Sequence, residues 1–198
     1  FQKALMKGLL RDHAGKIADL DAMIARFPNS ALIPSALLET GESHTELGDN
    51  ASAIRVYTDL SRRFPNTTQG RQGALLLAIA ELNSGQTDRA VTAYKHVISK
   101  YPTSEEARAA AEDLKHIYAD RGDISGYTSF LASVPDAPKM NQAELVALQL
   151  EGVEKGAEAG RDNDAVRLGR QLVEEFPDTP QAVEALAIVA SLDEKYGR

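Results

Sequence analysis

The sequence has no cysteine, no tryptophan and few other aromatic residues. Aromatic side chains make up 6% of its 198 residues. Because there is no thiol, disulfides, thiolate nucleophiles and zinc–cysteine sites are excluded. The hydrophobic fraction is 43% and is dominated by alanine and leucine. This composition favours helices over sheet.

Positive charge is also scarce. The formal net charge is −7, and Arg62-Arg63 is the only place where two residues of the Lys/Arg type are adjacent. A protein that binds duplex nucleic acid needs a basic face to displace counterions from the phosphates, so no nucleic-acid partner is expected. The same shortage of basic residues argues against docking on anionic lipid.

Long hydrophobic runs are missing as well. The longest extends from Ala74 to Ala80, far short of the roughly 18 residues that a membrane-spanning helix needs. No integral membrane segment is therefore expected. The sequence opens at Phe1 without a signal-like region, and we interpret it as a mature or trimmed fragment.

Two kinds of sequence marker recur along the chain, and both recur at the same spacing. An aromatic residue precedes proline at 27–28, 64–65, 101–102 and 176–177, at intervals of 37, 37 and 75 residues. A second series consists of Gly48, Gly85, Gly122 and Gly160, at intervals of 37, 37 and 38 residues. Agreement between two unrelated markers indicates a repeat architecture, in which each unit packs against its neighbours.

The stretch from Gln69 to Pro102 shows what one unit contains. Ala74 to Leu82 is apolar almost all the way round, which predicts a helix covered on more than one side. Gly85 ends this helix, since glycine is favoured just past a helix C-terminus. A second amphipathic helix follows and ends at Tyr101, because a residue before proline is pushed out of the helical region. The unit is a pair of helices joined by a tight turn.

The same unit is expected throughout a single domain covering residues 1–198. We predict helices at 1–11, 14–27, 32–47, 51–64, 69–84, 87–101, 104–121, 123–133, 142–159, 163–176 and 180–196. These group into repeats at about 1–28, 32–65, 69–102, 104–138 and 142–177, followed by a C-terminal capping helix at 180–196. The polar residues Asp193, Glu194 and Lys195 suit a solvent-facing end of the stack.

The period is least regular at residues 123–140. The segment from Val134 to Pro138 arrives early, which predicts a shortened helix followed by a loop. Asn141 lies three residues before Glu144, the spacing of a capping box, so a new helix should begin there.

The units resemble the tetratricopeptide repeat, a helix pair with small, aromatic and proline residues at set offsets. Before Pro65 these offsets hold Gly41, Gly48, Ala53 and Tyr57, and before Pro102 they hold Ala78, Gly85, Ala90 and Tyr94. Before Pro177 the match is partial, because Gly169 replaces the aromatic residue. The resemblance implies an all-α fold, a right-handed α-solenoid of about five helix pairs.

The length of the unit and its Tyr-Pro-x-Ser stop are more similar to bacterial envelope members of the family. These include the BamD-like and Tol-Pal coordinator-like proteins and the long repeat proteins of Bacteroidota. This resemblance implies a periplasmic or outer-membrane-associated protein, with a cytoplasmic location as the alternative.

In the resembling family, the first helix of each pair lines the concave side, where peptides or partner helices dock. Carrying those positions over gives the candidate partner-binding residues Leu38, Glu42, Thr45, Leu75, Ile79, Leu82, Glu112 and His116. Members that grip a C-terminal carboxylate have Lys and Asn where this chain has Leu38 and Glu42, so that activity is not expected. An apolar strip flanked by acids suits an amphipathic or basic segment instead. The alternative is that Leu75, Ile79 and Leu82 only pack against neighbouring helices.

No residues with the spacing of a catalytic or metal site appear. The four histidines, His13, His44, His96 and His116, lack the close spacing of metal ligands. Asp12, Asp19 and Asp21 lack the pattern of a calcium loop. We therefore expect no enzyme activity, no metal and no cofactor. Tyr57 and Tyr94 hold the family's aromatic position and are expected in the core.

Two functions remain open. The first is a non-enzymatic protein–protein interaction scaffold that binds a peptide or partner helix in its concave groove. The second is a structural spacer or self-association segment of a longer repeat protein.

Overall fold

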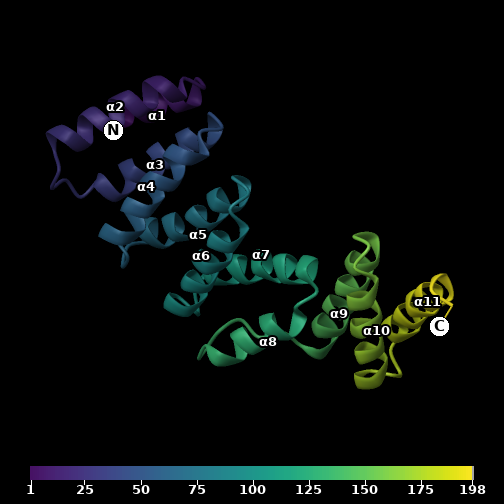
Figure 1. Cartoon of the computed structure of the whole chain (residues 1–198). Coiled ribbons are helices and arrows are strands. Elements are labelled where there is room, and N and C mark those ends of the chain that lie inside the picture. Colours follow the sequence, from purple (N-terminus) through teal and green to yellow (C-terminus); the bar gives the residue numbers. More distant parts are fainter. Residues whose placement is uncertain (198) are drawn as a thin grey trace. The chain divides into compact units, whose positions relative to one another are not determined.

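The computed structural model describes residues 1–197, and these form α-helices without any strand (Figure 1). In order, the helices are α1 (Gln2–Leu9), α2 (His13–Arg26), α3 (Ile33–Glu46), α4 (Asn50–Arg63), α5 (Thr68–Asn83), α6 (Thr87–Lys100), α7 (Glu105–Arg121), α8 (Ile124–Ser133), α9 (Gln142–Glu158), α10 (Asp162–Glu175) and α11 (Pro180–Lys195). Every predicted helix is present, with ends that differ by at most two residues. The prediction of an all-α fold made of stacked helix pairs is confirmed.

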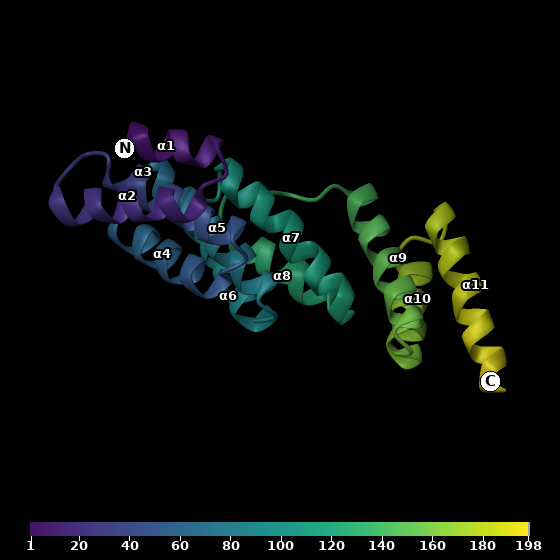
Figure 2. The same ribbon diagram turned by 90° about the horizontal axis from the view of Figure 1, so that it is seen from above.

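The chain divides into two compact units, Phe1–Ala110 and Ala111–Arg198. In the first unit, α1 packs on α2, α3 on α4 and α5 on α6, and contacts of α2 with α3 and of α4 with α5 join the pairs. In the second unit α9, α10 and α11 lie side by side (Figure 2), and α8 contacts α9. Whether residues 1–198 act as one solenoid domain stays a prediction.

The glycine markers are explained by the turn that joins the two helices of a pair. Gly48 has φ +72° and Gly85 has φ +76°. This is a left-handed backbone conformation that residues with a Cβ atom rarely adopt. Gly122 and Gly160 adopt it as well. The period of the glycines is therefore the period of the turns.

A side-chain cap begins α9 where the sequence predicts it. At the start of α9, the Asn141 side chain accepts from the Glu144 N–H, and the Glu144 carboxylate accepts from the Asn141 N–H, at 3.0 and 2.9 Å. This reciprocal pair confirms the predicted capping box. It restarts the helical stack after α8, which ends early as expected and is followed by the loop 134–141.

The core of each pair is built around aromatic and small residues. Tyr57 and Tyr94 are 1% and 0% exposed, which confirms their assignment to the core. Tyr127 of α8 is also buried, and its hydroxyl donates to the carbonyl of Ala111 at 2.9 Å. Burying an aromatic ring while satisfying its polar end is how such side chains stabilise an interior.

The solvent-facing end that the sequence suggested for the last helix is present in part, since Glu194 and Lys195 are exposed. Asp193 is only 18% exposed and forms an ion pair with Arg170 at 2.7 Å. Lys195 pairs with the buried carboxylate of Asp162, also at 2.7 Å. The side chain of Val183 is instead largely exposed on α11. The polar residues at the end of α11 therefore attach it to α10 rather than simply facing water.

Candidate partner-binding surfaces

Six of the predicted site residues lie on two neighbouring helices of the first unit. We call these residues, Leu38, Glu42 and Thr45 of α3 with Leu75, Ile79 and Leu82 of α5, the α3–α5 surface. The α5 residues follow their α3 counterparts by 37 positions, so they occupy equivalent places in successive repeats. The two helices contact each other, and Gln69 donates to Ser35 across them at 3.2 Å.

The apolar members of this surface are neither fully buried nor fully exposed. Leu75, Ile79 and Leu82 are all half-buried. Leu38 is also half-buried and packs against two core clusters, one around Leu60 and one around Tyr57. Leu38 therefore has a packing role in the fold, while the three α5 side chains leave apolar area in contact with solvent.

Glu42 is the residue of the α3–α5 surface whose carboxyl pKa is shifted. Burial raises the pKa of its carboxyl group, and the nearby negative charge of Glu39 adds to the effect. Lys16 is the closest compensating cation, but its ammonium pairs with Glu39 at 2.5 Å. No residue of the described chain forms a salt bridge with Glu42. It is a partly desolvated carboxylate beside an apolar strip.

Thr45 has a partner inside the fold. Its hydroxyl lies 3.3 Å from the hydroxyl of Tyr57, and it donates to the carbonyl of Gly41 at 3.1 Å. Burial raises the pKa of Tyr57 to about 12, so this ring stays protonated at physiological pH. The Thr45 side chain is thus engaged by the core, although the residue as a whole is exposed.

The other two predicted residues lie on α7 in the second unit, and both have charged neighbours. Glu112 pairs with Lys115 one helical turn away. His116 is 56% exposed and lies 3.1 Å from a carboxylate oxygen of Glu151. Each of them thus has a polar partner among the side chains of the protein itself.

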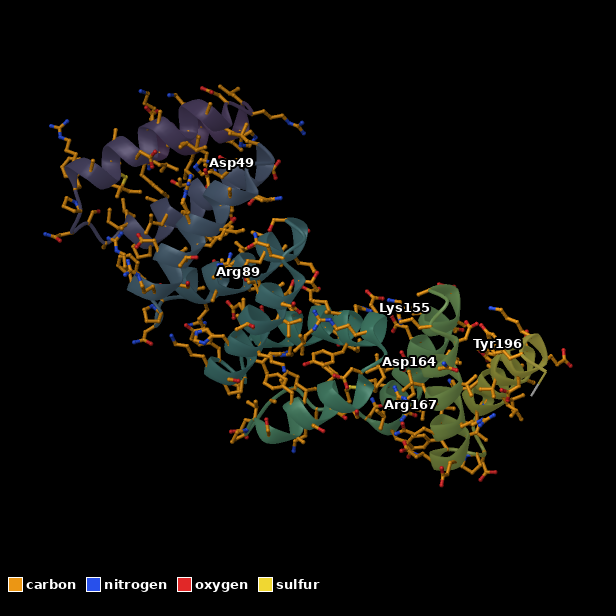
Figure 3. All side chains as sticks on the ribbon, viewed as in Figure 1. Asp49, Arg89, Lys155, Asp164, Arg167 and Tyr196 are labelled. Atoms are coloured by element: carbon orange, nitrogen blue, oxygen red, sulfur yellow. The ribbon has the colours of Figure 1, made fainter. Side chains whose placement is uncertain are left out.

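Sequence reasoning missed the residues of α9 that face α7. Lys155, labelled in Figure 3, lies 2.7 Å from Asp120 and 3.0 Å from Glu151. These two carboxylates raise the pKa of Lys155, and Lys155 in turn helps lower that of Glu151. The i, i+4 spacing of Glu151 and Lys155 was a signal for this pairing. The irregular loop before α9 obscured which helix they would face.

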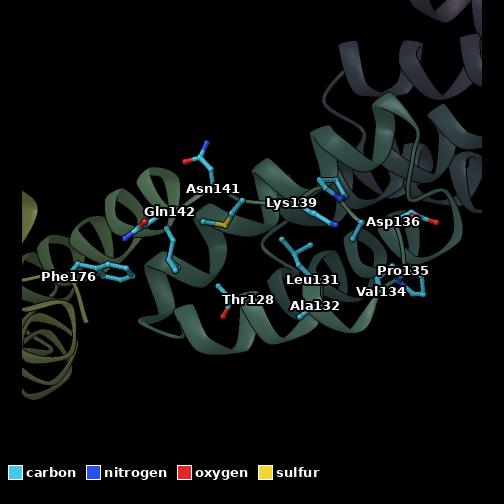
Figure 4. A pocket seen from close by; sticks show the side chains of 14 residues that line it. Thr128, Leu131, Ala132, Val134, Pro135, Asp136, Lys139, Asn141, Gln142 and Phe176 are labelled. Carbon is cyan, nitrogen blue, oxygen red and sulfur yellow. The ribbon is translucent and has the colours of Figure 1, made fainter. Parts of the chain in front are cut away.

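A second candidate surface lies in the second unit, at the loop 134–141. A cavity of about 650 Å³ is bounded by α8, this loop, the start of α9 and Phe176. Figure 4 shows Leu131 on the side of α8 and Phe176 beside Gln142. Its size falls within the range of roughly 300–1,000 Å³ that is usual for ligand pockets.

The described residues offer no metal site and no membrane span. No group of three or more His, Asp or Glu side chains within residues 1–197 is placed to hold a metal ion. None of the helices in that part of the chain combines the length and the hydrophobicity needed to cross a bilayer.

Stacked two-helix units define the class of this molecule as a helical repeat protein. A family model described as the tetratricopeptide repeat matches residues 35–67 and 73–104, which contain the pairs α3–α4 and α5–α6. The matched residues are tetratricopeptide repeats, and repeats of this kind generally form protein-interaction scaffolds and are typically non-catalytic. The envelope-type subclass stays a prediction.

Solved structures share this fold at low sequence identity. A tetratricopeptide repeat protein from Parabacteroides merdae is 15% identical, with 99% of this chain and 72% of that chain covered and a TM-score of 0.61. MamA is 14% identical, with 98% and 96% covered and a TM-score of 0.53. Among curated proteins, no sequence matches this chain. At these identities the likeness concerns the fold alone.

Proposed function

We propose that this protein is a non-enzymatic scaffold whose α3–α5 surface binds an amphipathic segment of a partner protein that carries a basic residue. The observation that supports this most is the state of Glu42. Its carboxylate is partly buried without a salt bridge from the described residues, and its pKa is raised by burial and by Glu39.

The chemistry of such a partner follows from this environment. Keeping a carboxylate charged in a partly desolvated place costs free energy unless a cation compensates it. A lysine or arginine of the partner would supply that cation at Glu42. The apolar face of the same segment would cover Leu75, Ile79 and Leu82, which are half-buried in the free protein.

A selection experiment tests this proposal. A display library of helical peptides is selected for binding to the purified protein. The affinity of each selected peptide is then measured for two variants that each add one positive charge. Ile79→Lys places a cation on the α3–α5 surface, whereas Thr92→Lys places one at an exposed position of α6. We expect selected peptides with a basic and an apolar face that lose binding to Ile79→Lys only. Peptides that bind both variants equally would contradict the proposal.

Exposed apolar side chains on the end helices favour the alternative, a spacer or self-association segment. At α1 these are Met6 and Leu9, with Leu10 directly after the helix, and on α11 they are Val183 and Leu186. Analytical ultracentrifugation over a range of concentrations separates the two functions. A monomer that binds a selected peptide supports the scaffold. Concentration-dependent assembly that Leu9→Glu or Leu186→Glu abolishes supports self-association.

We also propose a periplasmic or outer-membrane-associated location, supported by the resemblance of the repeat length and stops to envelope members of the family. Fractionation of the native cells with an antibody against this chain tests it. The protein should appear with periplasmic or outer-membrane markers, and recovery with cytoplasmic markers only would contradict the proposal.

A further inference from the structure

In the first unit, the segments that end the second helix of each pair share one arrangement of side chains. We call them stop segments. At three of them a basic side chain lies over the ring of the next residue, with Arg26 5.4 Å from the centre of Phe27, Arg63 5.0 Å from that of Phe64 and Lys100 5.5 Å from that of Tyr101. The hydroxyl of Tyr101 also donates to the carbonyl of Pro65 at 2.8 Å. An aromatic ring thus packs under a cation and links one stop segment to the preceding one.

The stop segment after α8 lacks this ring. Phe64 and Tyr101 directly follow their helices, whereas Val134 directly follows α8. Ala137-Pro138, which follows Tyr101-Pro102 by 36 residues, has no aromatic residue either. The helix before it is also shorter, with 10 residues in α8 against 14 in α4 and α6. Ala137 is buried and lines the cavity of about 650 Å³. The cavity therefore lies at the one joint where the aromatic side chain is missing.

The walls of the cavity suit an aromatic ring. Leu131, Val134, Leu145 and Phe176 supply apolar contacts, and Met140 adds a thioether. Ring–ring packing against Phe176 and sulfur–ring contact with Met140 each favour an aromatic guest over an aliphatic one of similar area.

A basic side chain also lies at this cavity and has no aromatic ring of the described residues against it. Lys139 lines the same cavity and is exposed. No aromatic ring or carboxylate of residues 1–197 is paired with it, in contrast to Lys100, which lies over Tyr101. The exposed amides of Asn141 and Gln142 lie at the same cavity and offer hydrogen bonds to a peptide backbone.

We propose that this cavity binds an aromatic side chain of a partner polypeptide, which supplies the ring that the stop segment after α8 lacks. The guest ring packs between Phe176 and Met140, with Lys139 against its face. Every residue of the cavity belongs to the second unit, so this site is separate from the α3–α5 surface. Loss of binding at one site leaves the other unaffected.

The smallest probe of this proposal is N-acetyl-phenylalaninamide, with N-acetyl-alaninamide as its control. Each is titrated into the labelled protein while the methyl resonances are followed by NMR. The aromatic probe should shift the methyl signals of Leu131, Met140 and Leu145, with a dissociation constant on the order of millimolar for so small a ligand. The alanine probe should leave them unchanged. Equal responses to the two probes would overturn the proposal.

Two variants locate the binding. Ala137→Phe adds the chain's own ring to the cavity wall, and Leu131→Glu places a carboxylate among the lining side chains. Either folded variant should weaken the aromatic probe at least about tenfold. Ser191→Glu, which changes an exposed serine of α11 in the same unit, is the control and should bind as the wild type does. If Ala137→Phe does not fold, Leu131→Glu decides alone. Binding at wild-type strength in either folded cavity variant would overturn the proposal.

Discussion

The ring of Tyr57 lies directly against Gly41. A Cβ atom built on this glycine would stand 2.3 Å from Cε1 of Tyr57, closer than side chains approach one another. Gly41 belongs to α3 and Tyr57 to α4, so the contact sets how closely the two helices of this pair pack. The small residue and the aromatic residue of the repeat are thus two halves of one contact.

We predict that Gly41→Ala destabilises the protein, although alanine is the better helix former. Overpacking a full core costs about 1–3 kcal/mol, which exceeds the helix-propensity gain of roughly 1 kcal/mol. The matched control is Gly152→Ala in α9, where the nearest atom lies 3.4 Å from the added Cβ. Thermal unfolding should show a lower Tm for Gly41→Ala and an equal or higher Tm for Gly152→Ala. A rise in both would mean that Tyr57 does not pack as described.

Tyr94→Ala should be among the most destabilising changes in the first unit. Tyr94 is 0% exposed, and truncating a buried aromatic ring costs about 3–5 kcal/mol. His96→Ala, two residues along the same helix at an exposed position, is the control. Chemical denaturation followed by circular dichroism measures both. An unfolding midpoint that Tyr94→Ala leaves unchanged would show that the repeat register is wrong.

The environment of Glu42 predicts a gain of stability when its charge is removed. Because the folded state raises the pKa of Glu42, that state binds the proton more tightly than the unfolded chain does. Its contribution to stability therefore falls as the pH rises from the ordinary carboxyl pKa of 4.5 through the raised value. Glu42→Gln should raise the Tm at pH 7, and the difference should shrink as the pH falls below 4.5. A Tm difference independent of pH would exclude this explanation.

The helix pairs could be predicted because their signals are local. A left-handed turn at Gly48, a stop at Tyr101 and a capping box at Asn141 each depend on a few neighbouring residues. Hydrophobic periodicity then assigned the inward faces, and the burial of Tyr57 and Tyr94 followed from their equivalent positions.

The surfaces were harder to predict, because they depend on contacts between distant residues. Lys16 is buried against Glu39, and no local sequence pattern around either residue predicts that pair. The partner of His116 is Glu151, beyond a loop that breaks the repeat period. The cavity near Ala137 is lined by residues of α8, the loop 134–141, α9 and Phe176, so it can be recognised only when these distant segments are placed together.

Charge reversal at Glu42 tests the proposed scaffold function most directly. Isothermal titration calorimetry would compare a selected basic peptide, and the same peptide with its basic residue changed to Glu, against the wild type and Glu42→Lys. We predict that Glu42→Lys weakens the basic peptide at least about tenfold and that the acidic peptide recovers the affinity. Equal affinity of the wild type and Glu42→Lys for the basic peptide would contradict the assignment of the α3–α5 surface as the partner-binding site.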